Sequence, residues 1–249
     1  TYVRPMNFPE FADGATWMTL YNEAQQARTP GTAPVYTQEQ IDNTRAGVNP
    51  WVFPDVDWRS VLFRKYNMNQ RANINVQGGG TRATYYMGLQ INHDTGILNA
   101  PKNYYFDNNI DNWGYTFQNN ISYKLTKTTK LELRMNAQIR SQSGPGEDIG
   151  GFFWDMYGNN PVAFPAVFPA EEGDTHIRFG NAVKTGNDLR TNPYAKLVNS
   201  HKEYNENTLN TTFRLHQDFD FITKGLKASM MVNWKNWSDA AYWQTITPY

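Results

Sequence analysis

The sequence predicts an all-β fold, part of an antiparallel transmembrane β-barrel with a short helix in a long extracellular loop. Three observations predict it. Long segments alternate between apolar and polar residues, they are arranged as hairpins with short turns and long links, and no segment is apolar enough for a spanning helix. The mean hydropathy of −0.70 is compatible with this fold, because barrel strands expose only every second residue to lipid.

The composition restricts the possible functions. Of 249 residues, 18% are charged and 15% are aromatic, and 28 are Asn. A chain this aromatic and this poor in charge is not typical of a disordered protein. The formal net charge is zero, so nucleic acid is not an expected partner, and the lack of cysteine excludes disulfides and thiol chemistry.

The first part of the chain predicts a long loop that contains a helix. Asp13 is a suitable N-cap for a helix over 14–27, and Thr37 with Gln40 forms a capping-box pattern for a second one. One face of the first helix carries Trp17, Leu20, Tyr21 and Ala24. Helices between strands are uncommon in simple porins, so we expect the segment 5–66 to be an elaborate extracellular loop of a large barrel.

Alternation of apolar and polar residues with a period of two predicts three hairpins. They pair 71–77 with 85–91, 113–125 with 131–139, and 209–219 with 226–234. The run Gly78 to Gly80 predicts a tight turn with positive φ in the first hairpin. The strands reach the roughly 9–11 residues that a tilted strand needs to cross a bilayer. The links 94–112 and 141–207 are long, and we expect the segment 141–207 to be a second extracellular loop.

The alternation also predicts which residues face lipid and which face the lumen. Ile121, Leu133 and Phe213 belong to the apolar set, which we expect to contact lipid. The candidates for facing the lumen or a ligand are Arg71, Asn73, Asn75, Arg134, Asn136, Gln138 and Arg140, with Gln77, Gln90, Asn92 and Glu132 beside them. The alternative is a generic polar interior without a ligand.

Aromatic residues mark two further candidate surfaces. In the long second loop, the candidates for contact with a partner or plug are Phe152, Phe153, Trp154 and Tyr157. The alternative is that this loop packs on itself. The candidates for an aromatic girdle at the membrane interface are Tyr104, Tyr105, Phe106, Trp113, Tyr115, Trp234, Trp237, Tyr242 and Trp243. In a soluble sheet the same residues would be packing residues.

No catalytic arrangement is evident in the sequence. The four histidines share no metal-ligand spacing, and Asp55 and Asp57 lie in a proline-bounded segment where turn formation explains them. We therefore expect no enzyme activity, no catalytic residue, no metal and no cofactor.

Several short motifs together resemble the SusC-like TonB-dependent transporters of Bacteroidetes outer membranes. In chain order they are Tyr21-Asn22-Glu23-Ala24, Pro54-Asp55-Val56-Asp57-Trp58, Leu62-Phe63-Arg64, Val76-Gln77-Gly78-Gly79, Tyr85-Tyr86, Gly96-Ile97-Leu98, Asn192-Pro193-Tyr194-Ala195 and Lys224-Gly225-Leu226-Lys227. Their order and spacing carry the resemblance, which spans almost the whole chain.

The resemblance implies that residues 1–249 form an early part of such a barrel. The plug domain, the segment that engages TonB and most of the strands would then lie outside this sequence. It implies active import of large nutrients, glycan or peptide, across the outer membrane. The implied partners are a SusD-like surface lipoprotein, the TonB energising complex and outer-membrane lipid. Two alternatives remain open, a carbohydrate-binding β-sandwich of a secreted or surface protein and a passive porin.

Overall fold

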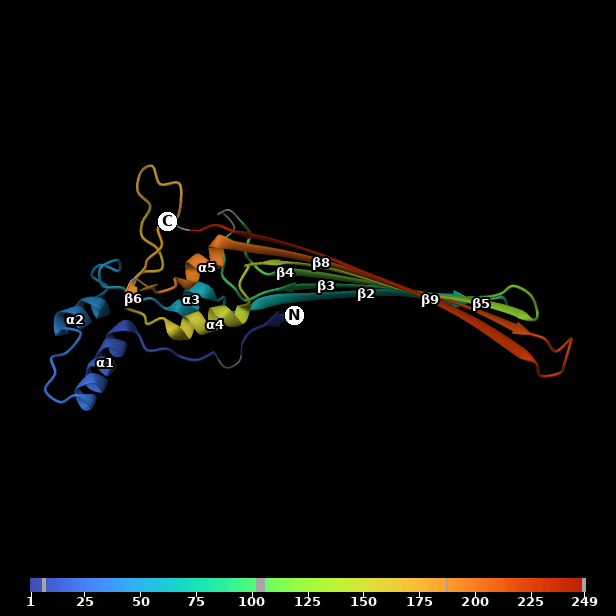
Figure 1. The fold of residues 1–249 in the computed structure, drawn as a ribbon, viewed down its shortest axis with the longest axis horizontal. Coiled ribbons are helices and arrows are strands. Elements are labelled where there is room, and N and C mark those ends of the chain that lie inside the picture. The colour runs from blue at the N-terminus through green and yellow to red at the C-terminus, as the bar shows by residue number, and fades with distance from the viewer. Residues whose placement is uncertain (6–7, 102–105, 187, 248–249) are drawn as a thin grey trace.

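The chain folds into one long antiparallel sheet with a helical head at one end (Figure 1). The computed structural model describes residues 1–5, 8–101, 106–186 and 188–247. The strands of the sheet, in spatial order, are β1 (Tyr2–Val3), β2 (Asn67–Gly79), β3 (Ala83–Thr95), β4 (Asp111–Lys124), β5 (Thr129–Gly144), β8 (Ser200–Asp218) and β9 (Lys227–Thr245). The sheet is open, as expected for part of a barrel, and the predicted fold class is confirmed.

We call residues 8–66, 96–101, 106–110 and 145–199 the head. It contains α1 (Gly14–Arg28), α2 (Gln38–Ala46), α3 (Trp58–Leu62), α4 (Ile149–Gly158), α5 (Pro193–Asn199) and the small hairpin of β6 (Val183–Thr185) with β7 (Asp188–Leu189). None of the helices in the described part of the chain has the length and apolar character needed to cross a membrane.

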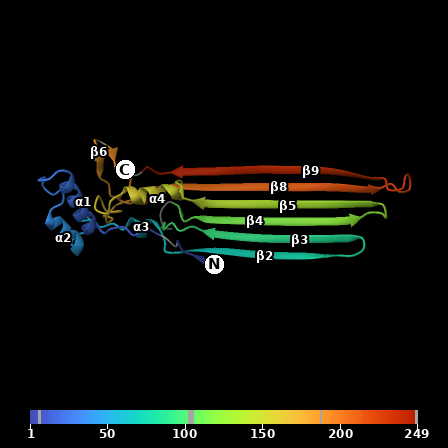
Figure 2. The same ribbon diagram turned by 90° about the horizontal axis from the view of Figure 1, so that it is seen from below.

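The three predicted hairpins are present, and their turns lie at the end of the sheet away from the head (Figure 2). Strand pairing extends over 19 residues in the last hairpin. The strands of the second and third hairpins run further than the alternation indicated, to Gly144 and from Ser200, so that the long second link spans 145–199. Short turns therefore lie at one end, the turn end, and long links at the other.

The expected positive φ in the first turn is wrong. Among the described residues, the glycines with positive φ include Gly225 in the third turn but none of Gly78 to Gly80. Strand β2 instead continues in extended conformation through Gly79, where a Cβ atom would lie 2.5 Å from the carbonyl oxygen of Ala83. Glycine is required here because the two backbones approach closely.

One face of the sheet is apolar and uncovered. Residues that pair directly across antiparallel strands share a face, and the pairs Ile121 with Leu133 and Leu133 with Phe213 lie on it. Ile74 is 66% exposed and Met230 is 54% exposed on the same face. Exposed apolar surface on this scale indicates contact with another apolar phase or surface.

The described residues do not form the two packed sheets of the β-sandwich alternative. A sandwich would bury the apolar face against a second large sheet. In the described ranges the only other sheet is the hairpin of β6 and β7, which lies in the head. Among the residues that the structure describes, no second sheet therefore packs on the apolar face.

The two helices predicted near the N-terminus are confirmed. Asp13 accepts a hydrogen bond from the Thr16 amide at the start of α1, and Thr37 and Gln40 form the capping box of α2. The core side of α1, however, is formed by Ala15 and Met18, which pack against α2. The face with Trp17, Leu20, Tyr21 and Ala24 is partly or fully exposed.

The links fold into a compact head with its own hydrophobic core. Leu62, Leu98, Phe152 and Leu197 are completely buried, although they come from α3, the first link, α4 and α5. Each of these elements is too short to be stable alone, and packing against the others supplies their stability. The sequence did not predict α3, α4 or α5.

Asn108 connects the first link to α5 and β8. Its side chain is 1% exposed, and its Nδ2 donates to the carbonyl oxygens of Leu197 and Ser200, each at 2.7 Å. Its Oδ1 lies 2.9 Å from Nδ1 of His201. We expect Asn108→Leu to lower the free energy of unfolding of the head by about 1–3 kcal/mol, because buried carbonyl groups lose their donor.

Hydrogen exchange of the α5 amides would measure the effect of Asn108→Leu. Asn108→Asp should also be destabilising, because it retains an acceptor for His201 but removes the Nδ2 donor. Unchanged protection in both variants would contradict the assigned contribution of this side chain.

Candidate functional site

The polar face of the sheet is the first candidate site. Cross-strand pairing connects Asn73 through Gln90 and Thr116 to Gln138, and it connects Arg71 through Asn92 and Gly114 to Arg140. The seven predicted lumen or ligand residues, Arg71, Asn73, Asn75, Arg134, Asn136, Gln138 and Arg140, all lie on this one face. Residues from β2 and β5 therefore share rows across four strands.

These side chains differ in whether they already form an ion pair or a hydrogen bond with another residue. The charged ones are paired, with Arg71 2.8 Å from Asp94 and Arg140 3.7 Å from Glu206. By contrast, the side-chain amide groups of Asn73 and Asn75 have no hydrogen-bond partner within the described residues. The face thus combines fixed charges with free amide donors and acceptors, which suits polar ligands or polar protein surfaces. Whether it binds either stays a prediction.

The predicted aromatic girdle is divided between the two faces. Trp113 and Tyr115 stack on one another, and Trp113 also stacks on His93 with ring centroids 4.0 Å apart.

At β9, Trp234 lies on the apolar face, but Trp237 pairs with Thr208 on the polar face and donates to Glu206. Trp243 likewise pairs with Lys202 on the polar face. Because the side-chain period is two, Trp237 and Trp243 cannot share a girdle with Trp234 and Tyr242. Tyr104 and Tyr105 lie outside the described residues.

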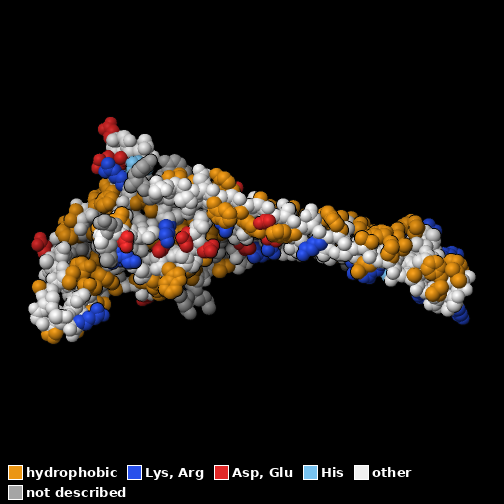
Figure 3. Space-filling view, viewed as in Figure 1, with side chains coloured by type: hydrophobic (Ala, Val, Ile, Leu, Met, Phe, Trp, Pro, Cys, Tyr) orange, Lys and Arg blue, Asp and Glu red, His pale blue; other side chains and the backbone are white. Residues whose placement is uncertain are grey.

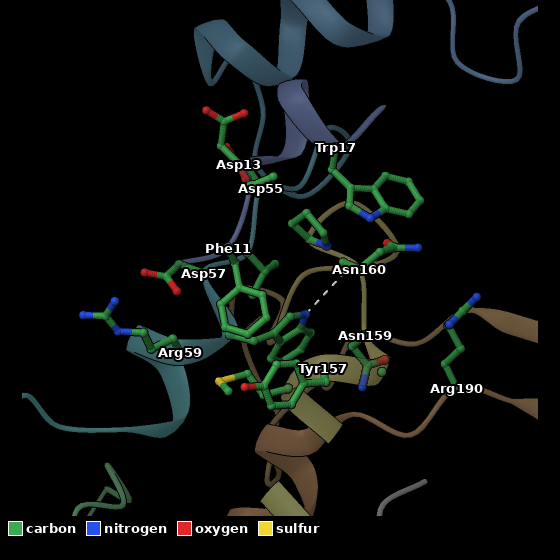
Figure 4. A pocket seen from close by; sticks show the side chains of 16 residues that line it. Phe11, Asp13, Trp17, Asp55, Asp57, Arg59, Tyr157, Asn159, Asn160 and Arg190 are labelled. Atoms are coloured by element: carbon green, nitrogen blue, oxygen red, sulfur yellow. Dashed lines mark hydrogen bonds between the residues drawn. The ribbon is translucent and has the colours of Figure 1, made fainter. Parts of the chain in front are cut away.

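A cavity of about 520 Å³ in the head is the second candidate site (Figure 4). Its aromatic lining includes Phe11, Trp17 and Tyr157, and the rings of Phe11 and Tyr157 lie 5.3 Å apart. Asn159 and Arg190 supply polar groups at the side of the cavity. Aromatic rings with a few polar groups are typical of ligand-binding pockets.

The carboxylates around this cavity are engaged in capping helices. Asp13 and Asp55 both accept from amides at the start of α1, and Asp57 accepts from the Ser60 amide and hydroxyl at α3. From the sequence we expected Asp55 and Asp57 to form a turn. The structure shows that their side chains instead accept hydrogen bonds at the starts of α1 and α3. The hydrogen bonds of these three groups therefore have a structural role at the helix N-termini. Within the ranges that the structure describes, no group of three or more histidine or acidic residues could hold a metal ion.

Hydrogen bonds to Asp13 make the stability of α1 depend on pH. The backbone amide of Thr16, and then its side chain, lower the pKa of the Asp13 carboxyl from its ordinary value of 3.8. A lowered pKa in the folded state stabilises the helix above the unfolded pKa, and this stabilisation is lost as the pH falls through the folded value. We expect Asp13→Ala to cost about 1 kcal/mol near neutral pH.

Hydrogen exchange of the amides in α1, measured at neutral and acidic pH, would detect this loss. Asp13→Asn is the matched control, because it keeps an acceptor but has no charge to titrate. It should retain protection at both pH values. Equal pH dependence in Asp13→Asn and the natural chain would assign the effect to another group.

The four predicted loop-contact residues divide into buried and exposed ones. Phe152 is 0% exposed and belongs to the core, so its prediction as a contact residue is wrong. Phe153 is half-buried and stacks on Phe63 with centroids 4.6 Å apart. Trp154 is 79% exposed and Tyr157 is 56% exposed, and both remain available for contact. The alternative that the loop packs on itself applies to the first two residues.

An ion-pair network fixes α4 to α5. Nζ of Lys196 lies 2.9 Å from Asp155 and 3.6 Å from Glu147. Burial opposes the charge on Lys196, but the hydrogen bond and attraction of Asp155, with those of Glu147, outweigh it and raise the pKa of the ammonium group. The N-terminus of α5 could have been found from the sequence, because Asn192 before Pro193 is a capping pattern and Asn192 does cap α5.

Comparison with known proteins supports the fold. No protein-family model matches the sequence, and no curated protein matches it in sequence. A structure of the RagAB peptide importer in an "open-open" state matches with a TM-score of 0.58 at 13% identity, over 96% of this chain and 27% of that chain. A second structure of the RagAB peptide transporter matches with a TM-score of 0.48 at 16% identity, over 91% of this chain and 23% of that chain.

This chain thus spans about a quarter of the length of the transporter chain that it resembles. At such low identity the likeness concerns the fold alone. Together with the open antiparallel sheet, it shows that the described chain has the fold of part of an outer-membrane β-barrel.

Proposed function

We propose that this chain is an early part of the barrel of a SusC-like TonB-dependent transporter, which imports large nutrients across the outer membrane. The observation that carries the proposal is the sheet itself. One face is apolar and uncovered, the other is polar across its six long strands, and the long links form a folded head at one end. A lipid-facing surface, a wet interior and elaborated loops account for these three features together.

The proposal includes cargo and partners. The cargo is a peptide or a glycan. The matched RagAB protein is a peptide importer, and this is the observation that favours a peptide. The segments 5–66 and 141–207 would be extracellular. Exposed Trp154 and Tyr157 would then face a SusD-like surface lipoprotein, and the TonB complex would supply energy through parts of the protein outside this chain.

Uptake by whole cells would test the proposal. Cells that contain the full-length protein should accumulate fluorescent oligopeptides or oligosaccharides, and cells without its gene should not. A protonophore should abolish uptake, because TonB transmits energy from the proton gradient of the inner membrane. Uptake that continues after the protonophore would indicate a passive porin. Recovery of the full-length protein in soluble form without detergent would contradict a membrane location.

Co-purification would test the partner surface separately. The variant with Trp154→Ala and Tyr157→Ala should lose a lipoprotein that co-purifies with the natural protein in detergent. Leu189→Ala is a matched control, because Leu189 is 59% exposed in the head but lies in the β6 and β7 hairpin. Equal loss in both variants would show that the aromatic pair is not the contact.

A further inference from the structure

A basic cleft lies on the polar face at the turn end, far from the head. It has a volume of about 350 Å³ and is lined by the turn that joins β4 to β5 and by the adjoining ends of β4, β5, β8 and β9. Its ionisable residues are Lys124, Lys127, Lys130, Lys227, His216 and Asp218. Figure 3 shows that, on the face in view, Lys and Arg side chains are present at the turn end and also over the head, whereas acidic side chains lie nearer the head.

The strand register places three of these basic residues in one row. Lys124 pairs directly with Lys130, and Lys130 pairs directly with His216. Like charges directly opposite one another destabilise a sheet, so this row is unfavourable unless anionic groups lie near it.

The anionic groups that the described residues supply are too few. Glu132 lies 2.7 Å from Lys130 and 3.6 Å from His216, and it also pairs with Arg134 and Arg214, so one carboxylate is shared among four basic side chains. Asp218 lies 3.9 Å from Lys227. Lys124 and Lys127 form no ion pair within the described part of the chain. The cleft therefore has at least two cations without a partner.

We propose that this cleft binds an acidic stretch of polypeptide, whose carboxylates lie between Lys124, Lys127 and Lys130. The remaining lining consists of Thr126, Thr128, Thr129, Gln217, Ala228 and Ser229. The hydroxyl groups of Thr126, Thr128 and Ser229 suit the polar backbone and carboxylates of a peptide, whereas Thr129 and Gln217 bond to one another on the other side of the sheet. The lining has no large apolar side chain that would hold the acyl chains of an anionic lipid, which is the other obvious source of negative charge. The inference concerns the turn end and does not depend on the proposed cargo.

The test is binding of fluorescent hexaglutamate to the full-length protein in a nonionic detergent at low ionic strength. The natural protein should bind hexaglutamate and not hexaglutamine, and binding should weaken as salt is added. The double variant Lys124→Gln with Lys127→Gln should weaken binding by about tenfold or more, because it removes two charge-assisted contacts. Lys235→Gln is the matched control, because Lys235 lies on the same face but outside the cleft.

A stability measurement distinguishes a ligand site from general surface charge. Without peptide, Lys124→Gln should raise the midpoint of thermal unfolding, since it removes repulsion with Lys130. With peptide, the natural protein should be stabilised more than the variant.

Several outcomes would overturn the proposal. The first is that Lys235→Gln weakens hexaglutamate binding as much as the double variant does. The second is that the natural protein does not bind hexaglutamate, and the third is that it binds inorganic phosphate as strongly as the peptide. Preferential binding to vesicles of anionic phospholipid would identify the cleft as a lipid site instead.

Discussion

Replacing Phe117 by arginine is expected to destabilise the inserted protein by about 2–4 kcal/mol, which is the cost of a basic residue on the lipid face near the midplane. Phe117 lies at the middle of β4 on the apolar face, between Leu89 of β3 and Ala137 of β5. If this face contacts lipid, a guanidinium group there must reach the interface or draw water into the hydrocarbon. The measurement is the denaturant midpoint of the full-length protein refolded into lipid vesicles.

The neighbouring residue provides the control. Gln118 lies on the polar face, where it pairs with Gly88 and Asn136. Gln118→Arg introduces the same side chain one residue away and should change the midpoint little. If both variants behave alike, the two faces do not differ in environment, and the assignment of lipid and lumen would be wrong.

Replacing Phe152 by alanine is expected to lower the free energy of unfolding of the head by about 3–5 kcal/mol. Phe152 is completely buried in the cluster with Leu62, Leu98 and Leu197, which joins three helices and the first link. The cavity left by the ring would lie where these elements meet, so the head should open while the sheet remains paired. Limited proteolysis of the segment 145–199 would detect the opening.

Trp154→Ala is the matched control for Phe152→Ala. Trp154 lies on the same helix but is 79% exposed, so its removal should leave the resistance to proteolysis almost unchanged. Equal sensitivity of the two variants would mean that the buried cluster does not hold the head together.

The hairpins could be predicted because they depend on local patterns. Alternation in segments such as 113–125 and 131–139 has the same period as the backbone pleat, so each strand and its two faces can be read from adjacent residues. The caps at Asp13 and Thr37 were also predictable, since a cap bonds to an amide within three residues. The extended conformation of Gly79 was not predictable, because its close approach to Ala83 depends on how far pairing continues.

The candidate site was predicted only in part. That Arg71 and Arg140 share a face follows from alternation, but that they share a row depends on the register of three strand pairs. The burial of Phe152 could not be predicted, because its neighbours lie far away in the chain and the helix that carries it is short. The same holds for the cavity in the head, which is formed by segments from residue 11 to residue 190.

The sequence by itself determined the long strands, the division of each of them into an apolar and a polar side, and the starts of the first two helices. These properties arise from interactions between residues close in the chain. The tertiary structure alone decided that the N-terminal segment and the two long links form one head, that Phe152 is core while Trp154 is surface, and that Lys124, Lys130 and His216 lie in a row. Such contacts join residues distant in the chain, and only the register and packing of whole elements bring them together.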